Sequence, residues 1–433
     1  MTAIHTTISR RRFVRLAGAA GALGAVGMMG CAAQGQAPRG RVVVIGGGFG
    51  GATAAKYVKK ADPAIDVTLV EQNPKFTTCP YSNLVLGGLR KMEDITFGYG
   101  ALADKHGVRV VHDAAVSVDP AQRTVRLRGG QTLNYDKLIM SPGIDIRWNA
   151  LAGYDEAASQ VMPHAWRAGE QTVLLRRQLE SMPDGGLVIM VAPANPFRCP
   201  PGPYERSCMI GHYLKTNKPR SKLLILDAKD QISKQGLFTD AWAKVYPNIV
   251  EWVPLSKDGK VTKVDVREMT VETEFGKRHR GNVVNVIPPQ KAGAIADAAG
   301  VADQTGWCPV DPMTMESKLQ KNIHVIGDAS NAAPMPKSGF AANSQAKVVA
   351  TAVVDMMNGR TPGAPAWLNT CYSHVAPNYG ISVVNVYRAT PQAFVEVQGS
   401  GGVSPVQAPP AMRVQEALFA DAWYESITAD MFG

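Results

Sequence analysis

Three glycines and one acid early in the chain have the types and spacing of a phosphate-binding site. Gly46, Gly48 and Gly51 form a GxGxxG pattern, and Glu71 follows about 20 residues after it. Glycines at these positions allow a sharp turn, let the backbone approach a pyrophosphate, and let a helix pack closely on a strand. The acid is placed to bind a ribose hydroxyl. Together these residues predict a bound dinucleotide.

Cysteines are the second group able to do chemistry. The chain has six, at positions 31, 79, 199, 208, 308 and 371. We expect Cys31 to be removed with a leader, and the odd number that remains means that at least one sulfur is free, ligated or paired outside the chain. Cys199 follows Arg198, whose charge lowers a thiol pKa. The alternative for Cys199 is a structural disulfide, which is common in exported proteins.

The elements that must position the glycines and Glu71 form a β-α-β unit. Branched apolar residues at 41–45 predict a buried parallel strand, and helix formers follow at 52–60. A phosphate on the glycine loop would therefore meet the positive end of a helix. The strand that ends at Glu71 is predicted at 66–70. Further strands are predicted at 108–118, 123–127 and within 135–143, the last ending in a tight turn at Gly143.

A second β-α-β pattern lacks the glycines. We predict strands at 187–192 and 222–227 and a helix at 204–215, but the loop at 193–203 is rich in proline. Proline has no amide N–H with which to hold a pyrophosphate. The second unit is therefore predicted not to bind a nicotinamide dinucleotide in the usual way.

The carboxyl-terminal half supplies the residues that specify which dinucleotide binds. A short strand ends in Gly327-Asp328, and Lys337-Ser338-Gly339 precedes a helix predicted at 340–357. Asp328 is suited to accept hydrogen bonds from the ribityl hydroxyls of FAD, and the alternative is a turn or helix cap. The helix that starts near Ser338 would point its positive end at the flavin pyrimidine ring, where Lys337 would also hold negative charge. These features favour FAD.

The amino-terminal residues resemble an export signal. Arginines at 10, 11 and 12 form a twin-arginine pattern, and 14 uncharged residues follow at 16–29, too few to span a bilayer. We therefore predict a signal peptide at 1–37 and a periplasmic location. The net charge is +10, but the basic residues do not form a stripe with interleaved aromatic residues, so nucleic-acid binding is not expected. The sequence predicts no transmembrane segment.

Several motifs together resemble the flavoprotein chain of flavocytochrome c sulfide dehydrogenase. They are Gly46–Lys60, Thr78-Cys79, Pro163–Trp166, Phe197–Glu205, Gly306–Asp311, Pro334–Gly339 and Asn369–Ser373. The resemblance covers nearly all of the mature chain, and it extends to sulfide:quinone oxidoreductases and FAD-dependent disulfide reductases. It implies an α/β fold with two Rossmann-like dinucleotide-binding domains of the disulfide-reductase type and a small α+β carboxyl-terminal domain. The predicted FAD-binding domain comprises 38–150 and 283–360, the second Rossmann-like domain 151–282, and the carboxyl-terminal interface domain 361–433.

The resemblance also implies roles for individual residues. FAD would be joined covalently through its 8α-methyl group to Cys79, for which the alternative is a buried small apolar residue. Cys199 and Cys371 would form a redox disulfide over the flavin, which sulfide or polysulfide attacks. Glu205 would accept the proton, or it would cap the helix that follows. Cys208 and Cys308 are assigned to the core.

The electron acceptor follows from motifs that the sequence lacks. There is no Cys-x-x-Cys-His for attaching haem c, and no amphipathic tail of the kind found in quinone-reducing relatives. We therefore expect a separate c-type cytochrome subunit to carry the haem, in a heterodimer. The alternatives are a sulfide:quinone oxidoreductase and a non-catalytic flavin accessory protein of a thiosulfate-oxidising system. A nicotinamide-dependent disulfide reductase is disfavoured by the proline loop.

A covalent flavin is directly testable. When the protein is denatured and precipitated in acid, the yellow colour is expected to stay with the pellet, because a thioether at Cys79 would survive unfolding. Colour recovered in the supernatant would contradict the bond.

Overall fold

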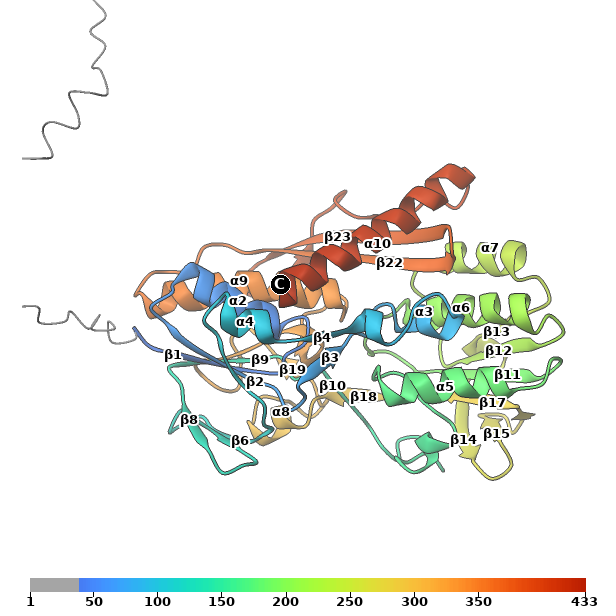
Figure 1. Ribbon diagram of the computed structural model, residues 1–433, viewed down its shortest axis with the longest axis horizontal. Coiled ribbons are helices and arrows are strands. Elements are labelled where there is room, and N and C mark those ends of the chain that lie inside the picture. The colour runs from blue at the N-terminus through green and yellow to red at the C-terminus, as the bar shows by residue number, and fades with distance from the viewer. Residues whose placement is uncertain (1–38) are drawn as a thin grey trace, which may run out of the picture. The chain divides into compact units, whose positions relative to one another are not determined.

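The computed structural model describes residues 39–433 (Figure 1). The predicted signal peptide at 1–37, including Cys31, lies outside the described residues. None of the helices in the described part is long and apolar enough to cross a membrane.

The first sheet confirms the predicted dinucleotide-binding unit. Five parallel strands are arranged in the order β20-β9-β1-β2-β5, which in chain order is the 3-2-1-4-5 arrangement of Rossmann folds. Their bounds are β1 Arg41–Ile45, β2 Asp66–Val70, β5 Arg109–Val111, β9 Lys137–Met140 and β20 Ile323–Val325. The apolar runs form central strands because both faces are covered. Ile45 pairs with Val70, so Gly46 and Glu71 reach the same edge of the sheet.

Two long helices cover one face of this sheet. In Figure 1, α2 (Gly51–Ala61) and α9 (Gly339–Met357) pack together on one side, and the small sheet β6 (Ala115–Asp119), β7 (Thr124–Leu127) and β8 (Thr132–Asn134) lies on the other. The strand predicted at 108–118 is two strands, β5 and β6. The chain turns between them at Asp113, whose carboxylate accepts hydrogen bonds from the backbone N–H groups of Ala114 and Gly129.

The second domain has four parallel strands in the order β13-β12-β11-β17. Their bounds are β11 Leu187–Ala192, β12 Lys222–Asp227, β13 Val250–Val253 and β17 Val283–Val286, and the helices are α5 Glu170–Ser181, α6 Gly202–Asn217 and α7 Gln235–Val245. The predicted boundary at 282/283 is too early. Val283–Val286 pairs with β11, so the second domain keeps this strand and the chain returns to the first domain after it.

The carboxyl-terminal domain joins the other two. Its sheet contains β22 (Ala366–Ala376), β23 (Tyr379–Ala389), β24 (Phe394–Glu396) and β25 (Gly402–Val403), and the helix α10 (Pro410–Phe432) packs on β23. Strand β22 contacts both α9 of the first domain and α6 of the second, as the upper part of Figure 1 shows. A residue on β22 can therefore meet residues of both Rossmann-like domains.

Short elements complete the connections. They are β3 Lys75–Thr77, α3 Ser82–Gly87, β4 Thr96–Gly98, α4 Gly100–Asp104, β10 Ile144–Ile146, β14 Val261–Asp265, β15 Thr270–Thr273, β16 Arg278–Arg280, β18 Gln290–Ala292, α8 Ile295–Ala298, β19 Cys308–Pro309 and β21 Ser330–Asn331. Strands β10 and β18 pair with each other and so link the segments that run between the two domains.

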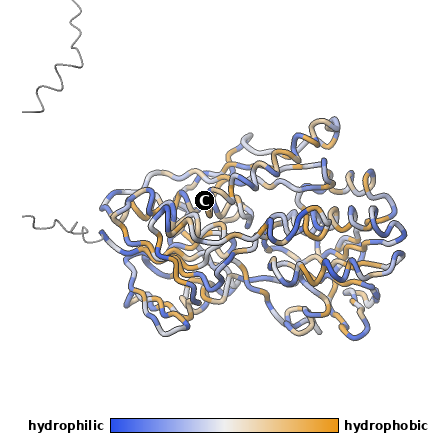
Figure 2. The backbone as a smooth tube through the Cα atoms, viewed as in Figure 1, coloured by the Kyte–Doolittle hydropathy of each residue, from blue (hydrophilic) through white to orange (hydrophobic). Residues whose placement is uncertain are grey.

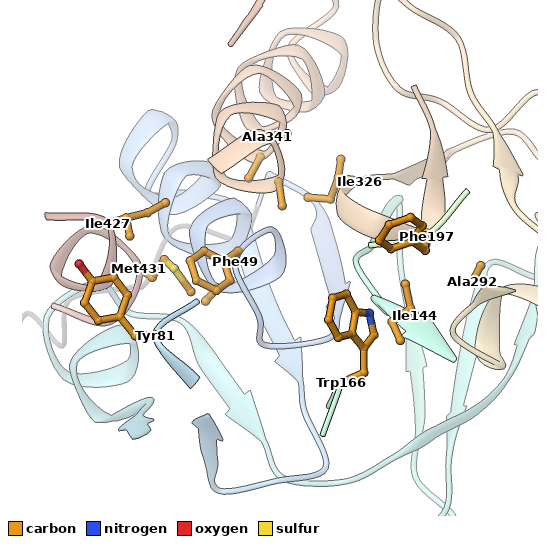
Figure 3. Packing of buried hydrophobic residues seen from close by; sticks show 14 of the residues in the cluster. Phe49, Tyr81, Ile144, Trp166, Phe197, Ala292, Ile326, Ala341, Ile427 and Met431 are labelled. Atoms are coloured by element: carbon orange, nitrogen blue, oxygen red, sulfur yellow. The ribbon is translucent and has the colours of Figure 1, made fainter. Parts of the chain in front are cut away.

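The main apolar core spans all three domains. The sheet strands appear as hydrophobic stretches in the interior of Figure 2. Cys208 and Cys308 are fully buried in this core, as predicted. Figure 3 shows aromatic residues of distant segments in it, and the ring of Trp166 lies 6.3 Å from that of Phe197. A second core, which includes Tyr154 and Val271, lies under the second sheet.

The contact between β23 and α10 tests how tightly the carboxyl-terminal domain is packed. A Cβ atom at Gly380 would lie 2.4 Å from the backbone nitrogen of Ala417. Gly380→Ala is expected to lower the free energy of unfolding by about 1–3 kcal/mol, because the helix must move away. Gly402→Ala, in open space on the same sheet, is the control and should change it by less than about 0.5 kcal/mol in urea unfolding. Equal effects would contradict this account.

Candidate active site

A cavity with a volume of about 1010 Å³ opens at the carboxyl ends of β1, β2, β9 and β20. In a parallel α/β sheet this edge is where ligands bind. Nine of the predicted site residues line it: Gly46, Gly48, Glu71, Cys79, Gly143, Cys199, Glu205, Asp328 and Ser338. Residues from the first and second domains therefore share one cavity.

The glycine loop is built as the motif predicts. Gly46 has a φ of +94°, a left-handed conformation that favours glycine. A Cβ atom at Gly51 would lie 1.7 Å from the carbonyl oxygen of Gly46, so only glycine lets α2 start so close to β1. Gly51 does not line the cavity, in keeping with this packing role. Glu71 accepts a hydrogen bond from the backbone N–H of Gly47 at 2.8 Å, which places its carboxylate beside the loop.

Asp328 has the features of a residue that awaits a hydroxylated ligand. Its carboxylate is buried, and one oxygen, Oδ1, has no hydrogen-bond partner among the described residues. Burial raises its pKa, against the opposing effect of Arg198, whose guanidinium lies 4.0 Å away. A buried polar atom without a partner is costly unless a ligand or water meets it. The ribityl hydroxyls of FAD are donors of the kind that would satisfy this oxygen.

The amino terminus of α9 faces the same cavity. Ser338 caps this helix by accepting a hydrogen bond from the N–H of Ala341 at 3.0 Å. Gly339 and Ala342, in the first turn, line the cavity. The positive end of the helix is thus presented to a bound group, as expected for flavin. The glycine loop, Asp328 and this helix end fit FAD.

Cys79 lies on the wall of the cavity, in the loop between β3 and α3. Its thiol donates a hydrogen bond to the carbonyl oxygen of Trp166 at 3.3 Å. The preceding residue, Thr78, is hydrogen bonded at 2.7 Å to the hydroxyl of Tyr424, on α10. The thiol is therefore accessible to a group in the cavity, while its loop is held by the carboxyl-terminal helix.

Cys199 and Cys371, which are 172 positions apart, are brought to the same region because β22 packs against both α6 and α9. Cys199 has a φ of +57°, and its N–H donates to the carbonyl oxygen of Lys337 at 2.8 Å. Cys371 Sγ lies 3.5 Å from Nδ2 of Asn369, and the Oδ1 atom of Asn369 accepts a hydrogen bond from Ser338. The structure holds both cysteines as free thiols, so the predicted disulfide is not formed in it.

The electrostatics of this thiol pair differ from the prediction. Arg198 was expected to lower the thiol pKa of Cys199, but burial raises it strongly and outweighs the arginine. A negative charge on Cys371 raises it further. Burial raises the pKa of Cys371 too, and Lys234 and Asn369 oppose this. In the reduced form both sulfurs are therefore neutral at neutral pH.

Glu205 lies beside the thiols and is not a helix cap. One carboxylate oxygen accepts from the side-chain amide of Asn83 at 3.0 Å, and the other accepts from the backbone N–H of His374 at 3.1 Å. The start of α6 shows no side-chain cap. The carboxylate lines the cavity, where it can exchange a proton with a bound molecule.

Lys337 is placed differently from the prediction. Its ammonium donates to the carbonyl oxygens of Asp328 (2.9 Å) and Ser330 (2.6 Å) and lies 3.9 Å from the centre of the Trp307 ring. Burial lowers its pKa to about 8. It does not line the cavity, because these loop carbonyls and the indole ring hold the side chain behind the wall. Lys337 braces the loop that carries Asp328.

Comparison with known proteins identifies the family. Family models match in three segments: pyridine nucleotide-disulphide oxidoreductase at 40–178, the central part of the flavoprotein chain of sulfide dehydrogenase (flavocytochrome c) at 172–288, and the flavin-binding part of flavocytochrome c sulphide dehydrogenase at 363–432. The sulfide dehydrogenase flavoprotein chain of Chlorobaculum thiosulfatiphilum is 67% identical over 45 residues, which are 10% of this chain and 94% of that sequence. The chain belongs to the flavocytochrome c sulfide dehydrogenase flavoproteins.

Other relatives place this flavoprotein in a wider group. Mitochondrial sulfide:quinone oxidoreductase of Mus musculus is 24% identical over 331 residues, covering 74% of this chain and 72% of that one. The structure of the sulfide:quinone oxidoreductase of Aquifex aeolicus matches with a TM-score of 0.70 at 20% identity, covering 90% of this chain and 92% of that one. The covalent putidaredoxin reductase–putidaredoxin complex matches with a TM-score of 0.65 at 16% identity, covering 88% and 93%. These likenesses establish the two-Rossmann-domain fold.

The end of β12 in the flavoprotein is filled by its own side chains. Asp227 accepts hydrogen bonds from Tyr204 (2.7 Å), Trp252 (3.0 Å) and Lys229 (2.5 Å), and Lys229 also donates to the carbonyl of Pro193. An acid at this position of a Rossmann unit would ordinarily bind a ribose. Here it is satisfied within the protein, in agreement with the reasoning from the proline loop.

Arg206 is a site residue that the sequence analysis missed. Its guanidinium is buried, and it donates to the carbonyl oxygens of His164 and Ala165 and to the side chains of Asn83 and Asn285. It fixes the segment whose next carbonyl, that of Trp166, binds Cys79. Arg206 directly follows Glu205, the last residue of the motif Phe197–Glu205, and this position could have drawn attention to it. An arginine side chain gives no indication by itself that it will be buried.

His164 makes this segment sensitive to acid. Its ring is buried, its Nδ1 atom accepts the N–H of Trp166 at 2.9 Å, and burial lowers its pKa to about 3. The unfolded chain has the usual value of 6.5. Below pH 6.5 the His164 ring is therefore protonated in the unfolded state but stays neutral in the folded state, and stability is lost as the pH falls toward 3.

Replacing this histidine tests the effect. Between pH 7 and pH 5, the free energy of unfolding of the parent should fall by about 2 kcal/mol more than that of His164→Asn, which keeps an acceptor but does not titrate. Urea unfolding at the two pH values measures the difference. Parallel losses in the two proteins would contradict a neutral buried His164.

Proposed function

We propose that this flavoprotein oxidises sulfide or polysulfide at the Cys199–Cys371 pair and passes the electrons through FAD to a c-type cytochrome subunit. The observation that carries the proposal is the approach of two cysteines from distant segments through Lys337, Ser338 and Asn369, next to a cavity that fits a flavin and that Cys199 lines. Membership of the sulfide dehydrogenase flavoproteins supports the choice of substrate.

The residues around the cavity define what the protein contributes. The glycine loop and Glu71 would hold the adenosine diphosphate part of FAD, Asp328 would hold the ribityl chain, and the start of α9 would stabilise negative charge on the flavin. Bound flavin accepts two electrons and passes them on one at a time. We further propose that Cys79 forms the thioether to FAD, since it lines the cavity on a loop held by the bond between Thr78 and Tyr424.

The sulfur chemistry begins from the disulfide form of the pair. Hydrosulfide attacks one sulfur, the Cys199–Cys371 bond breaks, and the products are a cysteine persulfide and a cysteine thiolate. When the thiolate and the persulfide re-form a sulfur–sulfur bond with the added sulfur between them, two electrons and one proton are released. A bound flavin would be the acceptor of these electrons. Exchange of this kind requires an accessible sulfur and a good leaving thiolate.

Glu205 is the proposed acceptor of the proton that is released when the thiolate and the persulfide re-form a sulfur–sulfur bond. Its carboxylate lines the cavity next to the pair and is oriented by Asn83 and by the backbone of His374. Two donors thus fix the orientation of the carboxylate, which is what a general base requires.

The carboxyl-terminal domain is the proposed surface for the cytochrome. The exposed face of α10 carries Leu418 and Phe419, each at least half exposed, and Val414 one turn earlier. Beneath this helix, the ring of Tyr424 stacks on that of Tyr81 at 4.0 Å, two residues after Cys79. Packed groups thus run from the proposed flavin attachment loop to an apolar surface. Export to the periplasm by the predicted twin-arginine signal would bring the chain to such a cytochrome.

A quinone acceptor is the second candidate. The relatives with long alignments include sulfide:quinone oxidoreductases, and the fold matches the one from Aquifex aeolicus. The third candidate is a non-catalytic flavin accessory protein, which differs from the other two because it requires no reaction at the cysteines.

Turnover measurements separate these functions. The purified holoprotein should oxidise sulfide with a c-type cytochrome as acceptor and should be slower with decylubiquinone. Cys199→Ser and Cys371→Ser should each lower the rate by about a hundredfold or more, because the sulfur-transfer step requires both atoms.

The controls use the buried thiols outside the cavity. Cys208→Ala and Cys308→Ala should keep most of the turnover. Faster reduction of decylubiquinone would favour the quinone reading, and partner function retained in Cys199→Ser would favour the accessory reading. Flavin bleaching by NADH would point to a nicotinamide-dependent reductase.

A further inference from the structure

Lys234 is a buried cation that the proposed reaction has not used. It directly precedes α7, it has a φ of +57°, and only 7% of it is exposed. Its ammonium donates to the carbonyl oxygen of Cys371 at 3.0 Å and to the hydroxyl of Ser373 at 2.8 Å. None of the ion pairs in the described part of the chain involves Lys234.

Both hydrogen bonds of this ammonium go to β22, the strand that carries Cys371. The groups whose negative charge would stabilise it are, in order of effect, Cys371 on β22, Glu205 on α6, Cys199 in the loop before α6 and Glu416 on α10. Burial disfavours the charged lysine, and a negative charge on Cys371 would be the first to offset that cost. The lysine is thus placed to be stabilised when Cys371 becomes a thiolate.

The two sulfurs are not equivalent in this respect. Cys371 has the Lys234 ammonium on its own carbonyl and the Asn369 amide 3.5 Å from Sγ. Cys199 has Arg198 as its nearby cation, and that guanidinium is shared with Asp328 and the carbonyl of Trp166. Cys199 lines the cavity, whereas Cys371 does not. One sulfur thus borders the cavity, and the other lies beside an ammonium and an amide that stabilise negative charge.

We propose that Lys234 is a positioning residue that makes Cys371 the leaving thiolate, so that hydrosulfide attacks Cys199. The inference rests on the proposed function. In this step a bond forms between the hydrosulfide sulfur and Sγ of Cys199, the Cys199–Cys371 bond breaks, and its electron pair goes to Sγ of Cys371. The proton of hydrosulfide stays on the new persulfide. No further oxidant is needed, because two electrons are only redistributed among three sulfurs.

Alkylation of the reduced holoprotein tests the charge on each sulfur. Reaction with iodoacetamide over a range of pH, resolved by peptide mass spectrometry, gives the titration midpoint of Cys371 and of Cys199 separately. The Cys371 midpoint should be the lower one. In Lys234→Gln, which can still donate to Ser373, the Cys371 midpoint should rise by about one pH unit, or about tenfold less thiolate at a given pH below it. Lys234→Arg should restore the parental value.

Lys56 offers a matched control. It is also 7% exposed and donates to two carbonyl oxygens, those of Asp430 and Gly433, but it lies on α2 away from the thiols. Lys56→Gln should leave both cysteine midpoints unchanged. If Lys234→Gln and Lys234→Arg shift the Cys371 midpoint equally, or if neither does, the lysine has only a packing role and the proposal fails.

A second measurement needs no variant. The oxidised parent is treated with hydrosulfide, and the persulfide is located by mass spectrometry. Persulfide on Cys199 is expected, and persulfide on Cys371, or a Cys371 midpoint at or above that of Cys199, would overturn the proposal even if Lys234→Gln does not fold. Failure of the proposed function appears differently, as a parent that does not oxidise sulfide while its two thiol midpoints remain distinct.

Discussion

The crossing of β22 over both Rossmann-like domains is the constraint on which the rest of the site depends. It brings Cys371 to a loop that is itself tied to the start of α9 through the bond from Cys199 to the carbonyl of Lys337. In the same region Ser338, which caps α9, donates a hydrogen bond to the side chain of Asn369 on β22. These bonds therefore fix three parts of the molecule relative to one another: the two cysteines, the helix end that faces the cavity, and the carboxyl-terminal domain.

Burial sets the chemistry of this unit. Taking two thiols out of water raises both pKa values, so charge appears on them only when a partner supports it. The supporting groups are unevenly placed: the Lys234 ammonium binds the carbonyl oxygen of Cys371, the Asn369 amide lies beside its sulfur, and Arg198 is next to Cys199 in the chain. Two cysteines thereby acquire different environments. When a disulfide between them breaks, one sulfur is favoured over the other as the leaving thiolate.

The second Rossmann-like domain supplies side chains to the site. Its glycine loop is replaced by the proline segment that shapes the backbone at Cys199, and the acid at the end of β12 is bound by Tyr204, Trp252 and Lys229. What remains is a rigid support that supplies Glu205 and Arg206 from α6 and Lys234 from the start of α7. An element that elsewhere binds a cofactor here presents side chains.

The sequence by itself determined the local elements and the type of cofactor. Runs of branched apolar residues, glycines at fixed spacing and an acid after a strand depend on neighbours within about 30 residues, and they were recovered nearly to the residue at β1, α2, β2 and α9. It also indicated the family, through motifs. It misplaced the boundary near 283, because whether Val283–Val286 joins one sheet or the other is a matter of pairing, which composition does not encode.

Only the tertiary structure decided the rest. The pairing of Cys199 with Cys371 came from resemblance, and no spacing rule could have given it, since the fold alone closes a separation of 172 positions. The direction of the Lys337 side chain, the raised pKa of Cys199 and the roles of Arg206 and Lys234 all depend on burial. Burial is a property of the assembled chain, because the residues that remove water from a side chain come from three domains at once.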